Sequence, residues 1–370
     1  MINPLDKLKK EVAKSKLDGI LISSFSNIVY LTNYSGFSKE EREAYLFIAK
    51  NKQYILTDGR YSQAVKTLIH NFNLIEISSK VSFEKAIKQL IKKHRIKRMG
   101  FEGNSLTFLE HKKLSSRFND LSAGKAGLNH FSLTNLRAIK DEEEISKIEK
   151  ACKLGDKTFD YILKKIKLGV SEKEIAFEIE FFIKKQGGDI SFRPIVAFGK
   201  NSAIPHHQTS DQRLKTKHKI VLLDFGVKLN NYCSDMARTV FFGQPTSEQK
   251  KMYQTVLEAQ KLAIDYLKSL ILNHKSIPAK NIDKVARDYI VSKGYKTIPH
   301  SLGHGIGIEV HETPHISPKS KDILKPGMVF TIEPGIYMPN FGGVRIEDIV
   351  VLKKPYPRLL TKSSRELTNV

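Results

Sequence analysis

The sequence contains little cysteine and no long hydrophobic run. Only two cysteines, Cys152 and Cys233, occur among 370 residues, which excludes a disulfide framework and favours an intracellular protein. No run of about 18 apolar residues is present to span a bilayer. The N-terminal segment lacks the apolar core and small-residue cleavage site of a secretory leader. These absences predict a cytoplasmic protein with no membrane partner.

Acidic residues are also scarce relative to basic ones, with 39 Asp and Glu against 62 Lys and Arg, a net charge of +23. Such an excess is one mark of nucleic-acid-binding proteins. The lysines, however, recur at helical spacing between apolar residues, as in residues 85–98, which is typical of solvated helix faces. No zinc-finger, helix-turn-helix or RNA-recognition pattern accompanies them. We therefore expect no nucleic-acid partner, and keep DNA binding as an alternative that a salt-dependent titration would test.

The length of the chain predicts two domains. In its first part, short apolar runs alternate with amphipathic stretches, a pattern typical of an α/β domain with a central sheet. The segment Asn129–Lys140 breaks this alternation and is interpreted as the connection to a second domain. We place the domains at residues 1–133 and 134–370. The expected strands of the first domain lie near residues 19–24, 45–50, 54–60 and 74–78.

The second domain combines long helices with strand pairs. One helix is expected to begin at a capping box, Ser171 with Glu174, and to stop at Gly187-Gly188. In each half of the domain, helices lead into a strand–turn–strand unit that carries acids. The expected helices lie near 141–167, 171–188, 247–272 and 279–294, and the strands near 195–199, 219–229, 231–243, 328–338 and 344–352.

Four carboxylates project from these apolar strands. A buried carboxylate without a counter-charge costs several kcal/mol. A single acid of this kind is best interpreted as a strand end in solvent. Four acids in two matching units, together with one nearby histidine, instead predict a metal site. The five candidate ligands are Asp224, Asp235, His304, Glu333 and Glu347.

The charge balance and the donor atoms indicate which metals would fit. Four carboxylates carry four negative charges, which two divalent ions neutralise. Oxygen-rich ligation with one imidazole and no thiolate suits Mn(II), Co(II) or Zn(II). Paired ions of this kind lower the pKa of a bound water and stabilise a developing oxyanion. The predicted chemistry is therefore hydrolysis.

His304 is flanked by Gly303 and Gly305, which leave the backbone unobstructed for a close approach. His311 follows seven residues later and is within reach of the same site if the chain is extended. Residues 311–315 also match the H-E-x-x-H pattern of zinc proteases. That pattern requires a helix, which Pro314 would break, so we reject it.

The five ligands, in order and in context, identify a family. The segments LDFGVKLNNYCSDMART, LGHGIGIEVHE, TIEPGIY and VRIEDIV resemble the pita-bread metallopeptidases, which include aminopeptidase P, prolidase and methionine aminopeptidase. The segments FSNIVYLTNYSGF, ILTDGRYSQA and LRAIKDEEEI resemble the creatinase-type N-terminal domain and linker of the proline-specific branch. The resemblance implies an α/β creatinase-type N-terminal domain followed by an α+β pita-bread catalytic domain.

The resemblance also implies a role for each ligand. Asp224 would bind one ion, while His304 and Glu333 would bind the other. Asp235 and Glu347 would bridge both ions. Glu333 would in addition relay a proton during catalysis.

Four further residues are interpreted. By resemblance, His206 in NSAIPHH contacts the substrate near the scissile bond, and His311 stabilises the tetrahedral intermediate. His207 is interpreted as solvent-facing or as a support for the site. Arg345 shares a strand face with Glu347, where it could bind a substrate oxygen or serve a structural role.

Two positions depart from the pattern of the family. Ala237 stands where many members carry threonine, whose hydroxyl could support a metal-binding carboxylate. Asn231 replaces a frequent glycine, which asparagine can do if the backbone is left-handed there. Neither change removes a ligand.

The implied reaction is hydrolysis of the bond before a proline at the second position of a peptide, as in an Xaa-Pro aminopeptidase. The alternatives are a prolidase restricted to Xaa-Pro dipeptides and a metal-free pita-bread protein used for binding. By resemblance, the N-terminal domain helps form a homodimer and limits substrate length.

Overall fold

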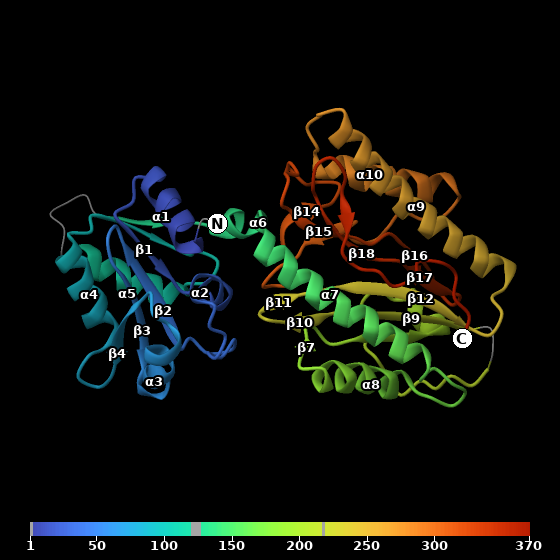
Figure 1. Ribbon diagram of the computed structural model, residues 1–370, viewed down its shortest axis with the longest axis horizontal. Helices are drawn as coiled ribbons and strands as arrows, with labels where there is room; N and C mark the ends of the chain where they lie inside the picture. Colours follow the sequence, from blue (N-terminus) through green and yellow to red (C-terminus); the bar gives the residue numbers. More distant parts are fainter. Residues whose placement is uncertain (1–2, 120–126, 217–218) are drawn as a thin grey trace. The chain divides into compact units, whose positions relative to one another are not determined.

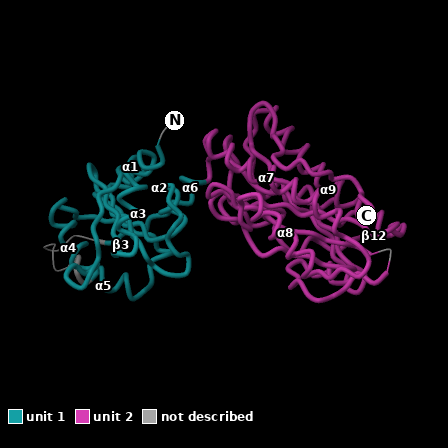
Figure 2. Tube along the Cα trace, turned by 60° about the horizontal axis from the view of Figure 1, so that its bottom comes forward, with its two compact units in different colours: residues 1–137 teal, residues 138–370 magenta. Residues whose placement is uncertain are grey.

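The computed structural model describes residues 3–119, 127–216 and 219–370. The chain forms two compact units, residues 1–137 and 138–370 (Figure 2). This division lies a few residues beyond the boundary that we placed at 133/134. None of the described helices is long and apolar enough to cross a membrane.

The N-terminal unit contains a mixed six-stranded sheet in the order β4-β3-β2-β1-β5-β6 (Figure 1). β2 runs antiparallel to both β1 and β3, whereas β5 runs parallel to β1 and β6. The strands are β1 Gly19–Ile22, β2 Ala44–Ala49, β3 Gln53–Asp58, β4 Asn73–Ile77, β5 Arg98–Phe101 and β6 Gly127–His130. The helices are α1 Pro4–Lys14, α2 Phe25–Thr32, α3 Gly59–Leu68, α4 Phe83–His94, α5 Phe108–Asn119 and α6 Thr134–Ala138.

Helix α4 shows how the lysine-rich pattern folds. Ser82 accepts a hydrogen bond from the backbone of Lys85 and begins the helix. The apolar residues Ile87, Leu90 and Ile91 are buried against the sheet side, and the intervening lysines are exposed. The prediction of a solvated lysine face is confirmed for this helix.

The predicted connection, Asn129–Lys140, is more ordered than expected. Its first two residues, Asn129 and His130, pair with β5 as part of β6. Residues Thr134–Ala138 then form the short helix α6. The segment looked irregular in sequence because β6 and α6 are each too short to show a period.

The C-terminal unit carries four long helices: α7 Glu142–Leu163, α8 Glu172–Lys185, α9 Ser247–Leu272 and α10 Ala279–Ser292. Its described strands form the sheets β11-β10-β7, β12-β9-β8 and β14-β13-β15-β18-β19 and the hairpin β16-β17. These strands are β7 Asp189–Ile190, β8 Ile195–Phe198, β9 Lys219–Phe225, β10 Val227–Leu229, β11 Tyr232–Cys233, β12 Met236–Phe242, β13 Gly303–Gly305, β14 Glu312–Ile316, β15 Val329–Ile332, β16 Gly335–Met338, β17 Gly342–Arg345, β18 Asp348–Val351 and β19 Arg358–Leu359.

Two hydrophobic cores hold the strands between helix pairs. One core packs α7 and α8, through Phe159 and Ile179 among others, against β8, β9 and β12. The other packs α9 and α10, through Val256 and Ile282 among others, against β15 and β18. Figure 1 shows the four helices around the strands of this unit. The predicted echo between the two halves therefore corresponds to two helix pairs, each covering strands that carry acids.

The helix starts follow the expected local chemistry. Ser171 and Glu174 form the predicted capping box of α8, and Asp141 with Glu144 forms another at α7. Helix α7 ends at Leu163, earlier than predicted, but Ile166 beyond its end is still buried.

The strands are shorter than predicted, because each long apolar run is broken where an acid or a turn occurs. Asp235 lies between β11 and β12, and Glu347 lies between β17 and β18. A two-residue turn, Asn230-Asn231, joins β10 and β11, with φ of 50° and 71°. Both residues are left-handed, as a type I′ turn requires, so the condition under which asparagine can replace glycine at 231 is met.

Candidate active site

A cavity of about 470 Å³ opens in the C-terminal unit. All eight residues assigned a ligand or substrate role line it: His206, Asp224, Asp235, His304, His311, Glu333, Arg345 and Glu347. Residues that the sequence analysis did not single out complete the wall, namely Phe192, Ile195, His300, Ser301, Val310 and His315. The structure therefore brings together side chains spread over more than a hundred residues of sequence.

Backbone hydrogen bonds between strands set the positions of the carboxylates. Asp224 lies in β9 opposite Ala237 of β12. The amide of Glu347 donates to the carbonyl of Ala237 at 3.0 Å, which joins the two acid-carrying strand units. Glu333 follows β15, and its amide donates to the carbonyl of Leu302 at 2.8 Å. Main-chain contacts therefore fix the positions of Asp224, Glu333 and Glu347.

His304 lies in β13 with its ring oriented by the backbone. Its Nδ1 atom is 3.1 Å from the carbonyl oxygen of Gly305, so Nδ1–H donates and Nε2 is left to face the carboxylates. Nε2 lies 3.6 Å from Oδ2 of Asp235 and 3.5 Å from Oε1 of Glu333. A histidine that ligates a metal through one nitrogen commonly donates the other N–H to a carbonyl in this way.

The glycines beside His304 serve the packing of neighbouring strands. A Cβ atom on Gly303 would lie 2.0 Å from the carbonyl oxygen of Thr331, and one on Gly305 would lie 2.3 Å from that of Thr313. The close approach that the sequence analysis inferred is therefore between β13 and the adjacent chain segments. It places His304 against Glu333, which follows directly after β15.

The buried carboxylates favour a cation. Burial raises the pKa of Asp235 and of Glu347 well above the usual range, and the neighbouring carboxylates raise both further. Burial likewise raises the pKa of Glu333 to about 8. Among the described residues, no hydrogen-bond donor reaches Oδ1 of Asp235 or Oε1 of Glu347. Ligand atoms of Asp235, His304 and Glu347 lie within 4.8 Å of one another. These residues fit a divalent ion, which would supply the missing positive charge.

Arg345 is the positive group found beside Asp224. Its Nη2 atom donates to Oδ2 of Asp224, and Nη1 donates to the Tyr337 hydroxyl at 2.8 Å and to the Pro205 carbonyl at 3.2 Å. The Tyr337 hydroxyl also lies 2.9 Å from Nε2 of His300. The sequence analysis missed Tyr337 and His300. Their only mark in the sequence is nearness to predicted ligands, with His300 four residues before His304.

Burial disfavours the charged form of three histidines of the site, His300, His304 and His311. Burial lowers the pKa of His300 and of His304 to about 4 each, and partial burial lowers the pKa of His311. The rings of His304 and His311 meet edge to face, with centroids 4.3 Å apart. His311 is thus within reach of the carboxylate cluster. The stretch between the two histidines is not extended, as the prediction required, but turns back between β13 and the antiparallel strand β14.

The structure decides between the two expectations for His207, solvent-facing or supporting. Its side chain is only 10% exposed, which excludes the solvent-facing alternative. It turns away from the cavity, with Nε2 2.8 Å from Oε2 of Glu172. Only the first of the two adjacent histidines, His206, lines the cavity.

The H-E-x-x-H pattern at 311–315 does not form a helix. Glu312–Ile316 is strand β14, paired with β13. The rejection of a single-zinc protease helix is confirmed, because on a strand the two histidines do not occupy successive turns.

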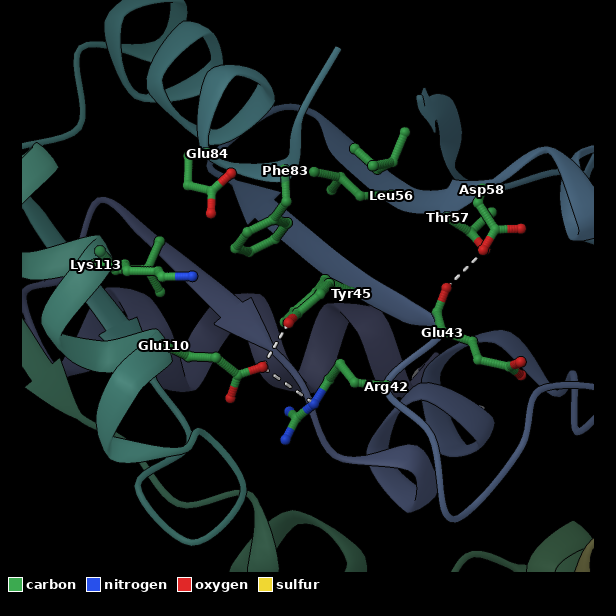
Figure 3. A pocket seen from close by; sticks show the side chains of 12 residues that line it. Arg42, Glu43, Tyr45, Leu56, Thr57, Asp58, Phe83, Glu84, Glu110 and Lys113 are labelled. Carbon is green, nitrogen blue, oxygen red and sulfur yellow. Dashed lines mark hydrogen bonds and ion pairs between the residues drawn. The ribbon is translucent and has the colours of Figure 1, made fainter. Parts of the chain in front are cut away.

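The N-terminal unit has a cavity of its own, about 320 Å³ in volume (Figure 3). Its charged side chains contact one another: the Tyr45 hydroxyl donates to Glu110 at 2.7 Å, and Nε of Arg42 lies 3.5 Å from the same carboxylate. No residue of the predicted site lines this cavity. We therefore locate the catalytic chemistry in the C-terminal unit.

Comparisons with known proteins agree with this site. Residues 146–354 match the model of metallopeptidase family M24, and residues 4–128 match the creatinase/prolidase N-terminal domain. The uncharacterized peptidase YqhT of Bacillus subtilis is 39% identical over 365 residues, 98% of this chain and 99% of that protein.

Two solved structures show the same fold over nearly the whole chain. An Xaa-Pro dipeptidase from Bacillus anthracis is 33% identical with a TM-score of 0.89, covering 99% of both chains. An X-Pro aminopeptidase from Thermotoga maritima is also 33% identical, with a TM-score of 0.84, covering 96% of this chain and 98% of its own. With its creatinase-type N-terminal domain and its carboxylate–histidine cavity, this chain belongs to the M24 family of pita-bread metallopeptidases.

Proposed function

We propose that this chain hydrolyses the Xaa-Pro bond at the N-terminus of peptides. The observation that carries the proposal is the cluster of Asp235, His304 and Glu347 in one cavity with the substrate-facing candidates His206 and His311. The names of the two solved relatives, an Xaa-Pro dipeptidase and an X-Pro aminopeptidase, support specificity for proline.

We assign two divalent ions to this cavity, with manganese as the first choice and cobalt or zinc as alternatives. Asp224 would hold one ion and His304 with Glu333 the other, while Asp235 and Glu347 would hold both. When bound, such ions activate water and stabilise an oxyanion. His304 is oriented for ligation by its Nδ1–H contact to Gly305.

The remaining groups act on the substrate. Glu333 would take a proton from the attacking water and pass it to the proline nitrogen as the amide bond breaks. His206 and His311 would donate hydrogen bonds near the scissile carbonyl, since both line the cavity beside the carboxylates. Arg345 remains a candidate for binding a substrate oxygen, and its contacts with Asp224 and Tyr337 fix the orientation of its guanidinium.

A dedicated enzyme for this bond is chemically reasonable. The nitrogen of an Xaa-Pro bond carries no hydrogen, and the proline ring fixes φ. Peptidases that bind an extended substrate through its N–H groups therefore handle the bond poorly.

The substrate length is the finer question. We propose the aminopeptidase activity, with a strict dipeptidase as the alternative that one of the solved relatives represents. The protein is loaded with Mn(II) or Co(II), and turnover of Ala-Pro is compared with that of Ala-Pro-Ala. Faster cleavage of the tripeptide supports the aminopeptidase, whereas cleavage of the dipeptide alone supports the dipeptidase. Ala-Ala-Ala serves as the control, and failure to cleave either proline peptide would overturn the proposal.

We further propose that the enzyme works in the cytoplasm as a homodimer. Both cysteines are buried and unbonded, which suits a reducing compartment. Sedimentation equilibrium of the purified chain tests the dimer, because a single species at the monomer mass of 42.1 kDa would contradict it.

A further inference from the structure

Glu172, outside the cavity, is the most completely satisfied carboxylate near the site. It is the first residue of α8 and is fully buried. Its Oε1 atom accepts hydrogen bonds from the Phe198 amide at 2.7 Å and from Nδ2 of Asn201 at 2.8 Å. Its Oε2 atom accepts from His207 Nε2 at 2.8 Å and from Ser210, through the amide at 3.0 Å and the hydroxyl at 2.6 Å.

All five donors belong to one segment, residues 198–210, and they lie on both sides of His206. Two precede His206 in the sequence and three follow it. His206 itself faces the cavity with Asp224 and His304, whereas Glu172 and His207 do not line it. The carboxylate of Glu172 thus holds residues 198–210 by hydrogen bonds from a position outside the cavity.

The helix does not need Glu172 for its own start. Ser171 and Glu174 already form the capping box, in which each side chain accepts a hydrogen bond from the backbone amide of the other residue. A buried carboxylate at this position is favoured by the positive end of the helix dipole. Its hydrogen-bonding capacity is then directed to the segment that carries His206.

A second set of hydrogen bonds, from residues of β17, holds the same segment. Nη1 of Arg345 donates to the Pro205 carbonyl, and the Gly343 amide donates to the Ser202 hydroxyl at 2.8 Å. The residues around His206 are therefore fixed between α8 and β17. Loss of either set would leave the His206 ring free to move relative to the metal-site carboxylates.

We propose that Glu172 is a positioning residue that acts through His207 and Ser210 to hold His206 against the cavity. This inference rests on the proposed function for the contact between His206 and substrate. The effect of the Glu172 hydrogen bonds on residues 198–210 can be tested without a substrate.

The kinetic test is a double-mutant cycle between Glu172→Gln and His206→Ala, with kcat and KM measured separately on Ala-Pro-Ala. A misplaced group costs up to about 100-fold in rate, so E172Q alone should lower kcat/KM by up to that factor. In the H206A background, the same change should alter kcat/KM by less than about 2-fold. An equal loss in both backgrounds would show a general structural effect and overturn the proposal.

The second test measures amide hydrogen exchange of the metal-loaded protein. E172Q should speed exchange in peptides covering residues 198–210. Glu174→Gln is the matched control, because it removes an acid from the same helix turn and preserves the capping box, and Glu174 contacts Ser171 and Arg213, which both lie outside residues 198–210. Unchanged exchange of residues 198–210 in E172Q would contradict the proposal that Glu172 holds this segment. If the wild-type protein cleaves no Xaa-Pro peptide, the proposed function fails, while the exchange comparison still decides the role of Glu172.

A milder variant guards against misfolding of E172Q. His207→Phe keeps an aromatic ring at this position and removes the Nε2 donor together with the other ring nitrogen. Its exchange in residues 198–210 should rise less than that of E172Q, and its loss of kcat/KM should again vanish in the H206A background. A loss that persists in that background would contradict action through His206.

Discussion

The ammonium group of Lys140 lies 3.2 Å from Oε2 of Glu312, and both side chains are almost completely buried. Lys140 stands at the start of the C-terminal unit, and Glu312 directly follows His311. The other oxygen of Glu312 accepts a hydrogen bond from the Glu309 amide at 3.0 Å. This ion pair therefore ties the chain that carries His311 to the first residues of the catalytic unit.

We expect Lys140→Met to lower the free energy of unfolding of the C-terminal unit by about 3–5 kcal/mol, because it removes the ammonium group beside a buried carboxylate. Lys173→Met is the control, since the Lys173–Asp211 pair is largely exposed and such pairs contribute about 0–1 kcal/mol. Chemical denaturation of both variants checks the difference. Equal losses of unfolding free energy in the two variants would show that burial does not increase the contribution of the Lys140–Glu312 pair.

Gly303→Ala should destabilise the unit by about 1–3 kcal/mol or more, because the added Cβ would overlap the carbonyl of Thr331 and push β13 away from β15. It should also reduce bound metal, since His304 moves with β13. Gly155→Ala in α7 is the comparison. Its Cβ would meet Ser234 at an ordinary 3.7 Å, and alanine favours a helix by about 0.5–1 kcal/mol. Melting curves and metal analysis of both variants test this prediction. A Gly303→Ala variant with the same melting temperature as Gly155→Ala would contradict the predicted clash with Thr331.

The metal-free protein should lose stability as the pH rises from 6.5 to 8. In the folded state Glu333 keeps its proton up to about pH 8, whereas in the unfolded chain it ionises near its ordinary value of 4.5. The unfolded state is thus favoured increasingly across this interval. The lowered pKa values of His300 and His304 act in the opposite sense, but only between about pH 4 and 6.5.

Melting temperatures measured with a chelator from pH 6.5 to 8 test this dependence. Added Mn(II) should raise the melting temperature more at pH 8 than at pH 6.5, because the ion binds the ionised carboxylates. Glu333→Gln removes one titrating group and should flatten the chelated profile. A slope in that variant as steep as in the wild-type protein would rule out Glu333 as a cause.

His304→Ala should lower the number of metal ions bound per chain, whereas His315→Ala should leave it unchanged. Among the described residues, Asp235, His304 and Glu347 have possible ligand atoms within 4.8 Å of one another. His304 is the histidine of this group. His315 instead lies on strand β14. Metal content after dialysis against limiting Mn(II) separates the two, and equal loss in both variants would contradict the assignment of His304 rather than His315 as the ligand.

Much of the catalytic unit was predictable because its chemistry is local. Capping residues predicted the start of α8. Asparagine tolerates a left-handed backbone, which is the conformation found at Asn230 and Asn231. The grouping of acids in apolar strands predicted a charged site, since such placement is costly without a counter-charge. The short elements β6 and α6 escaped prediction, because elements of four or five residues show too little periodicity.

The sequence by itself determined the two-unit organisation, the main helices and strands, and the group of acids in apolar strands that lines part of the cavity. These follow from periodicity, capping and the cost of burying charge, all of which act between near neighbours, whereas the roles of His206 and His311 came from resemblance to the family. Only the tertiary structure decided that His207 turns to Glu172, that Tyr337 links His300 to Arg345, and that the glycines beside His304 accommodate Thr331 and Thr313. Those contacts join residues far apart in the chain, and no local pattern encodes which distant partner a side chain will meet.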